Sequence, residues 1–144
     1  MKVRIKKLND NAVMPTKAHT ADAGFDLYCT SKEIDWTKRQ IVCHTGLAFE
    51  IPEGYVGLIF PRSSVSNKPL MMANSVGVVD SCYRGEVTAK FNITDTRQNA
   101  FTHYQEGDRI AQMIIIPYPE IEFEEADSLS DSDRGTGGYG STGR

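Results

Sequence analysis

The stretch GVVDSCYRGEV, residues Gly77–Val87, predicts a β-hairpin with one carboxylate and one aromatic ring at its tight end. Its paired valines are β-branched strand formers, and Asp80-Ser81 is typical of a turn, because short polar side chains bond their own backbone. Asp80 and Tyr83 lie near glycines that allow a ligand to approach the main chain. An ordinary surface hairpin would carry the same residues. Beyond the turn, the residues that alternate onto one predicted core face are Val87, Ala89, Phe91 and Ile93.

The rest of the chain predicts further strands and little helix. A short helix capped by Ser63 is expected over residues 63–68, after Pro61 ends a strand. The segments 55–60 and 109–116 are almost continuously apolar, which predicts strands buried on both faces. We therefore expect an all-β fold: one jelly-roll-like or β-barrel domain over residues 1–127 with a flexible, glycine-rich tail over residues 128–144. The other predicted strands are 3–5, 24–29, 40–44, 47–51 and 121–123.

Composition excludes several classes of function. The 144 residues carry a net charge of −3, whereas a nucleic-acid surface usually has a basic excess. No apolar run reaches transmembrane length, and the chain opens directly into an alternating segment, so neither a membrane span nor a signal peptide is expected. Three cysteines without CxxC spacing predict reduced thiols in a cytoplasmic protein. The three histidines are too scattered to predict a metal site.

The tail from Ser128 is rich in Gly, Ser and Asp, and such segments are often flexible and without function. It nevertheless combines groups that suit a polyphosphate: the guanidinium of Arg134, main-chain N–H groups around Gly138, and hydroxyls of Ser141 and Thr142. Tyr139 is placed to stack on a base. The alternatives are a silent tail and a lid that closes over a ligand.

Five stretches resemble, in order, the five motifs of the trimeric dUTPase family (deoxyuridine 5'-triphosphate nucleotidohydrolases). The resemblance implies a jelly-roll-like fold and Mg²⁺-assisted hydrolysis of dUTP to dUMP and pyrophosphate, which limits uracil in DNA and supplies dUMP for dTMP synthesis. It also implies a homotrimer in which motifs one, two and four come from one subunit, the hairpin from a second and the tail from a third. The stretches are AGFDLY from Ala23, PRSS from Pro61, GVVDSCYRGEV from Gly77, GDRIAQ from Gly107 and RGTGGYGSTG from Arg134.

The resemblance also implies a role for individual residues. Asp80 matches the general base that activates a water for attack on the α-phosphorus. Asp26 matches an aspartate near the water shell of the metal, with a purely structural aspartate as the alternative. The residues expected to bind phosphate are Arg62, Ser63, Ser64, Gln112, Arg134, Ser141 and Thr142, with the backbone near Gly138.

Base and sugar selection falls to the predicted hairpin in this resemblance. The main chain of Gly77, Val78 and Val79 would pair with uracil, and Tyr83 would pack beneath the deoxyribose and leave no room for a 2′-hydroxyl. A pocket that excludes the thymine methyl gains only about 1–3 kcal/mol of discrimination. The remaining expected contacts to the nucleoside are Asn74, Thr88 and, covering the uracil, Tyr139.

Two residues depart from the family pattern. Ser64 stands at the usual glycine of motif two, and Cys82 at a usual acidic position of motif three. Two other functions remain as alternatives. A dCTP deaminase of the same fold attacks the base, and the Asp80–Tyr83 pair and the tail argue against it. A nucleotide-sensing or partner-binding module of the same fold would need a binding surface, and no large insertion offers one.

Overall fold

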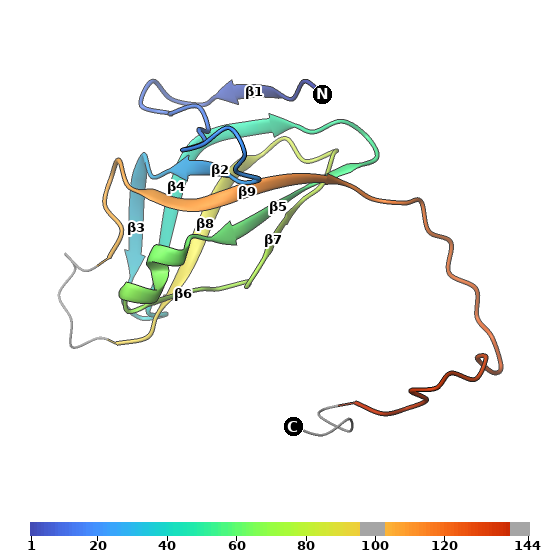
Figure 1. Ribbon diagram of the computed structural model, residues 1–144. Helices are drawn as coiled ribbons and strands as arrows, with labels where there is room; N and C mark the ends of the chain where they lie inside the picture. Colours follow the sequence, from blue (N-terminus) through green and yellow to red (C-terminus); the bar gives the residue numbers. More distant parts are fainter. Residues whose placement is uncertain (96–102, 139–144) are drawn as a thin grey trace.

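A computed structural model describes residues 1–95 and 103–138 of the chain. Its strands form two antiparallel sheets, which confirms the all-β prediction (Figure 1). One sheet has the order β1-β4-β8-β6, with β3 also paired to β4, and the other has the order β2-β9-β5-β7. The elements are β1 (Arg4–Lys7), β2 (Phe25–Tyr28), β3 (Ser31–Asp35), β4 (Gln40–Glu50), β5 (Tyr55–Pro61), the 3-10 helix η1 (Ser63–Asn67), β6 (Leu70–Met72), β7 (Gly77–Val79), β8 (Glu86–Ile93) and β9 (Arg109–Pro117).

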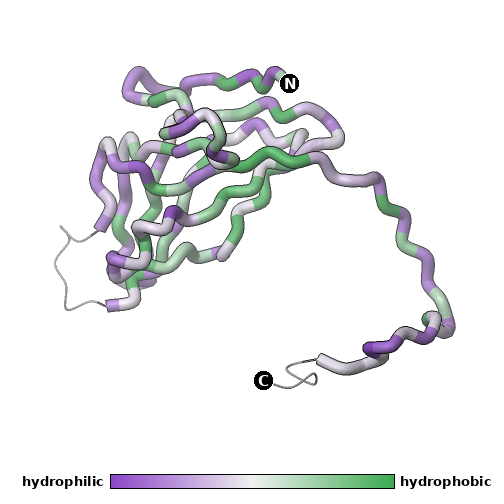
Figure 2. Tube along the Cα trace, viewed as in Figure 1, coloured by the Kyte–Doolittle hydropathy of each residue, from purple (hydrophilic) through white to green (hydrophobic). Residues whose placement is uncertain are grey.

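The hydrophobic core lies between the two sheets (Figure 2). Along β8 the predicted alternation is confirmed, since every second side chain from Val87 to Ile93 is buried. Phe91 packs against Tyr104 with ring centroids 5.0 Å apart, a favourable tilted arrangement. Side chains from both sheets complete the core, among them Leu27, Ile41, Cys43, Ile59, Ile110 and Met113.

The predicted hairpin at Gly77–Val87 is wrong, although both of its strands exist. β7 pairs with β5, whereas β8 pairs with β4 and β6. The segment between them therefore crosses from one sheet to the other, with a turn in which the Tyr83 N–H donates to the Asp80 carbonyl at 3.1 Å. Alternating side chains identify a strand but not its partner, because both sheets need the same alternation.

β4 runs as one long strand from Gln40 to Glu50, where two strands, 40–44 and 47–51, were predicted. The register between β4 and β8 shifts between His44 and Ala48, and Gly46 within this bulge has a φ of 65°. A bulge bends a strand without ending it, and glycine reaches a positive φ without a steric penalty. The break predicted between residues 44 and 47 is therefore the bulge itself.

β5 and β9 are not buried on both faces, as was predicted from their apolar runs. Within β5 only Gly57 and Ile59 are buried, and Ile116 near the end of β9 is 39% exposed. Each sheet of a two-sheet sandwich packs one face on the core, so the second apolar face of these strands is open in the single chain. An apolar outer face of this kind is available for contact with another subunit.

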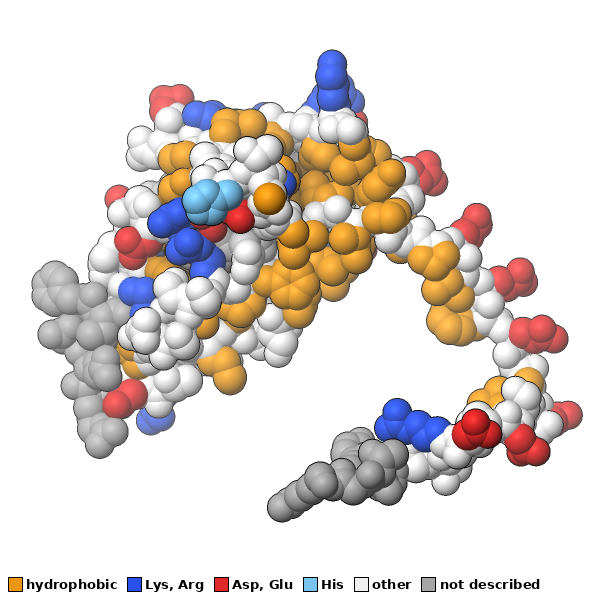
Figure 3. Space-filling model, in the orientation of Figure 1, with side chains coloured by type: hydrophobic (Ala, Val, Ile, Leu, Met, Phe, Trp, Pro, Cys, Tyr) orange, Lys and Arg blue, Asp and Glu red, His pale blue; other side chains and the backbone are white. Residues whose placement is uncertain are grey.

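The short helix predicted over residues 63–68 is the 3-10 helix η1. Its N-cap is Arg62, without a side-chain capping bond, so the expected cap at Ser63 is wrong. The predicted strand at 121–123 does not form either. After Pro117 the chain leaves the sheets as an extended segment, exposed through residue 136 (Figure 1). Figure 3 shows acidic side chains at intervals along this segment. Across the described ranges, no helix is long and apolar enough to cross a membrane.

Candidate active site

A pocket of about 190 Å³ opens between β7 and β8, and we name it the β7–β8 pocket. β7 is the last strand of its sheet, so one edge of its main chain has no partner strand. Free N–H and C=O groups on such an edge can pair with a ligand as they would with another strand. Seven predicted residues line the pocket, namely Asn74, Gly77, Val78, Val79, Asp80, Tyr83 and Thr88.

Tyr83 forms one wall of this pocket. Its hydroxyl donates a hydrogen bond to the Glu86 carbonyl at 3.0 Å, and the side chain is 46% exposed. A Cβ atom on Gly85 would overlap the phenol, so only glycine lets the ring lie over this part of the main chain. The ring is therefore fixed at its hydroxyl end and presents an open surface to the pocket.

Asp80 follows β7 directly and is exposed at the pocket. Its carboxylate makes no ion pair within residues 1–95 and 103–138. An ionised carboxylate only accepts hydrogen bonds, so a free one can take a proton from a bound water. Cys82, one of the two departures from the family pattern, faces a different cavity, which it lines together with Arg4 and Arg84. The missing acidic side chain therefore does not alter the lining of the β7–β8 pocket.

A second pocket, of about 310 Å³, lies between β2 and η1, and we name it the β2–η1 pocket. Asp26 accepts from Arg62 Nε at 2.7 Å and from Arg109 Nη1 at 3.1 Å. Because the bond to Asp26 uses Nε, the terminal nitrogens of Arg62 remain for an anion in the pocket. The pocket residues that the sequence predicted as phosphate or metal contacts are Asp26, Arg62, Ser63 and Gln112.

Gln112 is opposite Asp26 in the β2–β9 ladder and donates from Nε2 to the Pro61 carbonyl at 3.3 Å. Gly24 makes room for it, since a Cβ there would lie 2.5 Å from Gln112 Oε1. The polar side chain in this otherwise apolar strand thus has a partner and reaches the pocket. Ser64 lies in η1 outside the pocket lining, and its backbone φ is negative, so a glycine is not required at this position.

A divalent metal would find few direct protein ligands here. In the described parts of the chain, no three His, Cys, Asp or Glu side chains gather as a metal site. The carboxylate of Asp26 is already paired with two arginines, so its contact with a metal would run through water. This suits Mg²⁺, which keeps several waters and binds mainly to substrate phosphates.

The two pockets share no lining residue. Arg134 and Gly138 lie in the extended segment, away from both pockets, and Arg134 Nε donates to the Gly137 carbonyl at 2.8 Å. Tyr139, Ser141 and Thr142 lie outside the described residues. The structure thus gathers most of the residues predicted to contact the nucleoside in one pocket, and the predicted phosphate contacts Arg62, Ser63 and Gln112 in the other.

Comparison with known proteins addresses the family directly, because the dUTPase family profile matches residues 10–143. This chain belongs to the dUTPase family. A deoxyuridine 5'-triphosphate nucleotidohydrolase of Nautilia profundicola is 41% identical over 145 residues and the match covers all of both chains. The corresponding protein of Tropheryma whipplei is 42% identical over 131 residues, covering 90% of this chain and 88% of its own. The family and the enzyme class predicted from the sequence are thereby confirmed.

Solved dUTPases have the same fold. The dUTPase of Staphylococcus bacteriophage 80alpha, a G164S mutant with dUpNHpp, superposes with a TM-score of 0.86 at 28% identity and 99% coverage of both chains. A D95N mutant dUTPase from phage phi11 of S. aureus, described with a structural Mg(II) ion, gives a TM-score of 0.75 at 26% identity, covering 90% of this chain and 99% of its own. The jelly-roll-like fold expected from the sequence is confirmed.

Three residues at or near the two pockets were not predicted to have a role there. Arg109 follows the motif-four aspartate and was overlooked, although it pairs with Asp26. Glu86 alternates with the predicted core residues of its strand and was not predicted as a site residue, yet it lines the β7–β8 pocket. The sequence did offer a signal for Glu86, because this residue follows Gly85 within motif three. His44, which contacts Glu86, lies outside all five motifs and gave no signal in the sequence.

Proposed function

We propose that this chain hydrolyses dUTP to dUMP and pyrophosphate, with attack of a water on the α-phosphorus. The observation that carries the proposal is the gathering of Asp80, Tyr83 and the free edge of β7 around one pocket. Such a reaction would limit uracil in DNA and supply dUMP for dTMP synthesis. The binding of dUpNHpp by the bacteriophage 80alpha dUTPase supports a uracil nucleotide as the ligand.

Recognition of the base would use the main chain of β7. Its N–H and C=O groups offer the donor and acceptor pattern that uracil requires and cytosine reverses. Gly77 brings the strand close to its neighbours, since a Cβ there would lie 3.1 Å from the Ile59 Cβ. Tyr83 would lie against the sugar and exclude a 2′-hydroxyl, while Asn74 and Thr88 make further contacts to the nucleoside.

Catalysis would fall to Asp80 as the general base. Its carboxylate is exposed at the pocket that holds the nucleoside, and the α-phosphate is the phosphate nearest to the sugar. A positioned base typically contributes about 10²–10⁴-fold to the rate. The carboxylate would orient the water and accept its proton as the bond to phosphorus forms and pyrophosphate leaves.

The triphosphate would be bound by Arg62, Ser63 and Gln112, with Ser64 contributing its backbone in η1. Mg²⁺ on the phosphates would offset their negative charge, with Asp26 in its outer shell. Residues 128–144 are proposed as the lid, which would add Arg134 and the glycine-rich main chain to the outer phosphates. Tyr139, Ser141 and Thr142 would complete the lid over base and phosphates.

A homotrimer would unite the two pockets. One nucleotide needs both, yet they share no lining residue within a chain. The open apolar faces of β5 and β9 provide surface for subunit contact. We propose that the β2–η1 pocket of one subunit faces the β7–β8 pocket of a second, and that a third subunit supplies the lid.

The test is pyrophosphate release with Mg²⁺ from dUTP, dTTP, dCTP and UTP in parallel. Release from dUTP alone is expected, because the pocket would select both base and sugar. Equal release from UTP would contradict the role of Tyr83. Binding of dUTP without release from any of the four would contradict the hydrolytic function and favour a nucleotide-sensing, partner-binding module of the same fold.

A further inference from the structure

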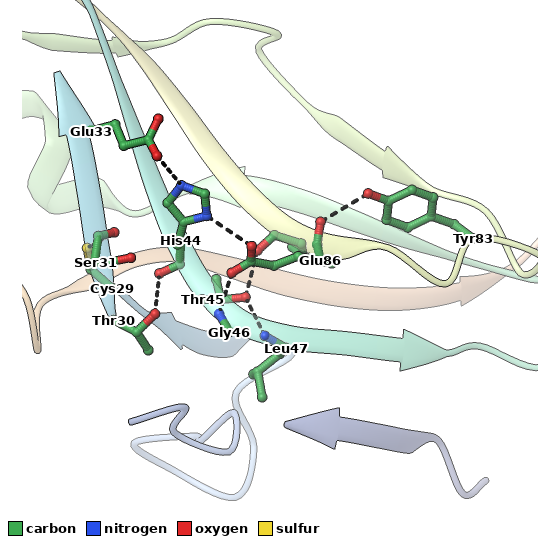
Figure 4. A network of polar contacts seen from close by, with 11 residues as sticks. Cys29, Thr30, Ser31, Glu33, His44, Thr45, Gly46, Leu47, Tyr83 and Glu86 are labelled. Atoms are coloured by element: carbon green, nitrogen blue, oxygen red, sulfur yellow. Dashed lines mark hydrogen bonds and ion pairs between the residues drawn. The ribbon is translucent and has the colours of Figure 1, made fainter. Parts of the chain in front are cut away.

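The outer face of the first sheet carries a line of polar contacts that ends at the β7–β8 pocket (Figure 4). Glu86, the first residue of β8, places Oε2 2.9 Å from His44 Nδ1, and its Oε1 accepts the Gly46 N–H at 2.7 Å. On the other side of the imidazole, Glu33 Oε1 lies 3.8 Å from His44 Nε2. Because an ionised carboxylate only accepts hydrogen bonds, the proton of this pair is on His44 Nδ1.

These contacts arise at the bulge of β4. Between His44 and Ala48 the ladder with β8 is interrupted, and side chains replace its bonds. Thr45 Oγ1 donates to the Val87 carbonyl at 2.6 Å, and Glu86 accepts the N–H of Gly46. The side chains of His44 and Glu86 are 25% and 26% exposed, so the pair is more protected from water than a surface ion pair. The carboxylate of Glu86 thus anchors the start of β8 to β4.

The anchored residue in turn holds Tyr83. The phenol donates to the Glu86 carbonyl at 3.0 Å and lies over Gly85, so it follows any displacement of the start of β8. Glu86 and Tyr83 both line the β7–β8 pocket. His44 is absent from the lining of that pocket, so its influence on a ligand there runs through Glu86.

We propose that His44 and Glu86 are positioning residues that hold Tyr83 against the sugar and thereby set the discrimination between 2′-deoxyribose and ribose. The inference rests on the proposed function, because it assumes a deoxynucleoside in the β7–β8 pocket. Exclusion of a hydroxyl depends on the place of the ring to within about 0.5 Å, which is the precision that supporting contacts give a binding group. Loss of the anchor would therefore admit ribose without removing any ligand contact.

The experiment compares kcat/KM for dUTP and UTP in the full-length protein and in three variants. His44→Leu removes the donor to Glu86 and is expected to lower the dUTP to UTP preference about tenfold, chiefly through KM. His44→Asn keeps an N–H donor near the position of Nδ1 and should stay within about twofold of the original preference. Glu33→Gln is the matched control, since this exposed carboxylate is beyond hydrogen-bond distance from His44, and should change the preference by less than about twofold.

Affinities for dUMP and UMP, measured by calorimetry on the same variants, give the sugar preference without turnover. A preference in His44→Leu equal to that of the unaltered protein would overturn the inference, even if the melting temperature fell, because that combination describes a merely structural contact. A protein that releases no pyrophosphate from dUTP overturns the proposed function instead. In that case the dUMP to UMP affinity ratio still supports or overturns the role of His44.

Discussion

The β7–β8 pocket and the β2–η1 pocket are lined by different kinds of chemical group. The first is shaped by the main chain of an edge strand, by apolar side chains and by one tyrosine. The second is built around ionised groups, with Arg62 and Asp26 paired at its wall and Asp22 beside them. The first suits a neutral base and sugar, which are recognised by shape and hydrogen-bond pattern, and the second suits a charged phosphate group.

This difference indicates how each pocket responds to change. A pocket formed by main chain loses selectivity when the backbone or a packed ring shifts by a fraction of an ångström. A pocket formed by charges loses affinity when a charge is removed, and it tolerates small displacements better. Substitutions in the β7–β8 pocket should therefore change mainly selectivity, and substitutions in the β2–η1 pocket mainly affinity.

The largest effect is expected at Asp80. The change Asp80→Asn keeps the size of the side chain but removes the proposed proton acceptor, so turnover of dUTP should fall at least about 10³-fold while nucleotide affinity is retained. Single-turnover kinetics together with calorimetry with dUTP would measure both quantities. Normal turnover in Asp80→Asn would show that another group is the base.

Arg62 should affect affinity more than selectivity. The change Arg62→Ala removes the charged group that we propose to bind phosphate, a contact worth about 1.5–3 kcal/mol, and leaves Asp26 with one arginine partner. We expect roughly a 10–100-fold rise in KM for dUTP with the preference for dUTP over UTP intact. Arg62→Lys should restore little, because lysine has no counterpart to the Nε–H that bonds Asp26. Steady-state kinetics with both nucleotides checks this, and an altered sugar preference would contradict the separation of the two pockets.

Gly24→Ala should change the β2–η1 pocket less than Arg62→Ala does. The new Cβ would lie 2.5 Å from Gln112 Oε1 and displace that side chain. Loss of the hydrogen bond that we propose Gln112 makes to phosphate would cost about 1 kcal/mol, so KM for dUTP should rise about fivefold with kcat nearly unchanged. An unchanged KM, with the fold verified by circular dichroism, would remove Gln112 from the phosphate contacts.

The smallest effect concerns His103, which lies outside both pockets. Burial lowers the pKa of His103, and nearby Lys32 and Lys68 lower it further. The unfolded chain then binds a proton more readily than the folded one, so stability is fully present above about pH 6.5 and declines as pH falls toward the folded pKa. Thermal unfolding between pH 5 and 8 should show this decline, and His103→Phe should reduce it. An equal slope in the variant would assign the acid sensitivity to other groups.

Sequence reasoning predicted both pockets from short motifs, but it misplaced some of the structure around them. Motif residues such as Arg62 and Gln112 reach one pocket because β5 and β9 pair, and the apolar runs of these strands were visible. The partners of β7 and β8 were not visible, because alternation does not specify which strands pair. The strands β3 and β6 were missed because one is rich in charged residues and the other has only three residues.

The contacts that support the motifs were the hardest to predict. His44 meets Glu86 only because β4 bulges at Gly46, 40 residues before the carboxylate it contacts. No local pattern specifies such a long-range pairing. Ser64 and Cys82 depart from the family pattern, and the sequence does not show whether they alter the site. In the structure neither side chain lines the pocket of its own motif.

Mixing two variants that are each impaired in a different pocket tests the central claim, that one site takes its two pockets from different subunits. Asp80→Asn alters the lining of the β7–β8 pocket alone, and Arg62→Ala alters the lining of the β2–η1 pocket alone. The two proteins are mixed in equal amounts, unfolded and refolded together. Each site then draws its two pockets from two chains, and each pocket has an even chance of being unaltered, so about a quarter of the sites in random trimers should be intact. At a dUTP concentration well below the raised KM of Arg62→Ala, pyrophosphate release at about a quarter of the rate of the unaltered protein is the predicted result. Release no higher than the mean of the two separate variants would show that each site belongs to a single chain.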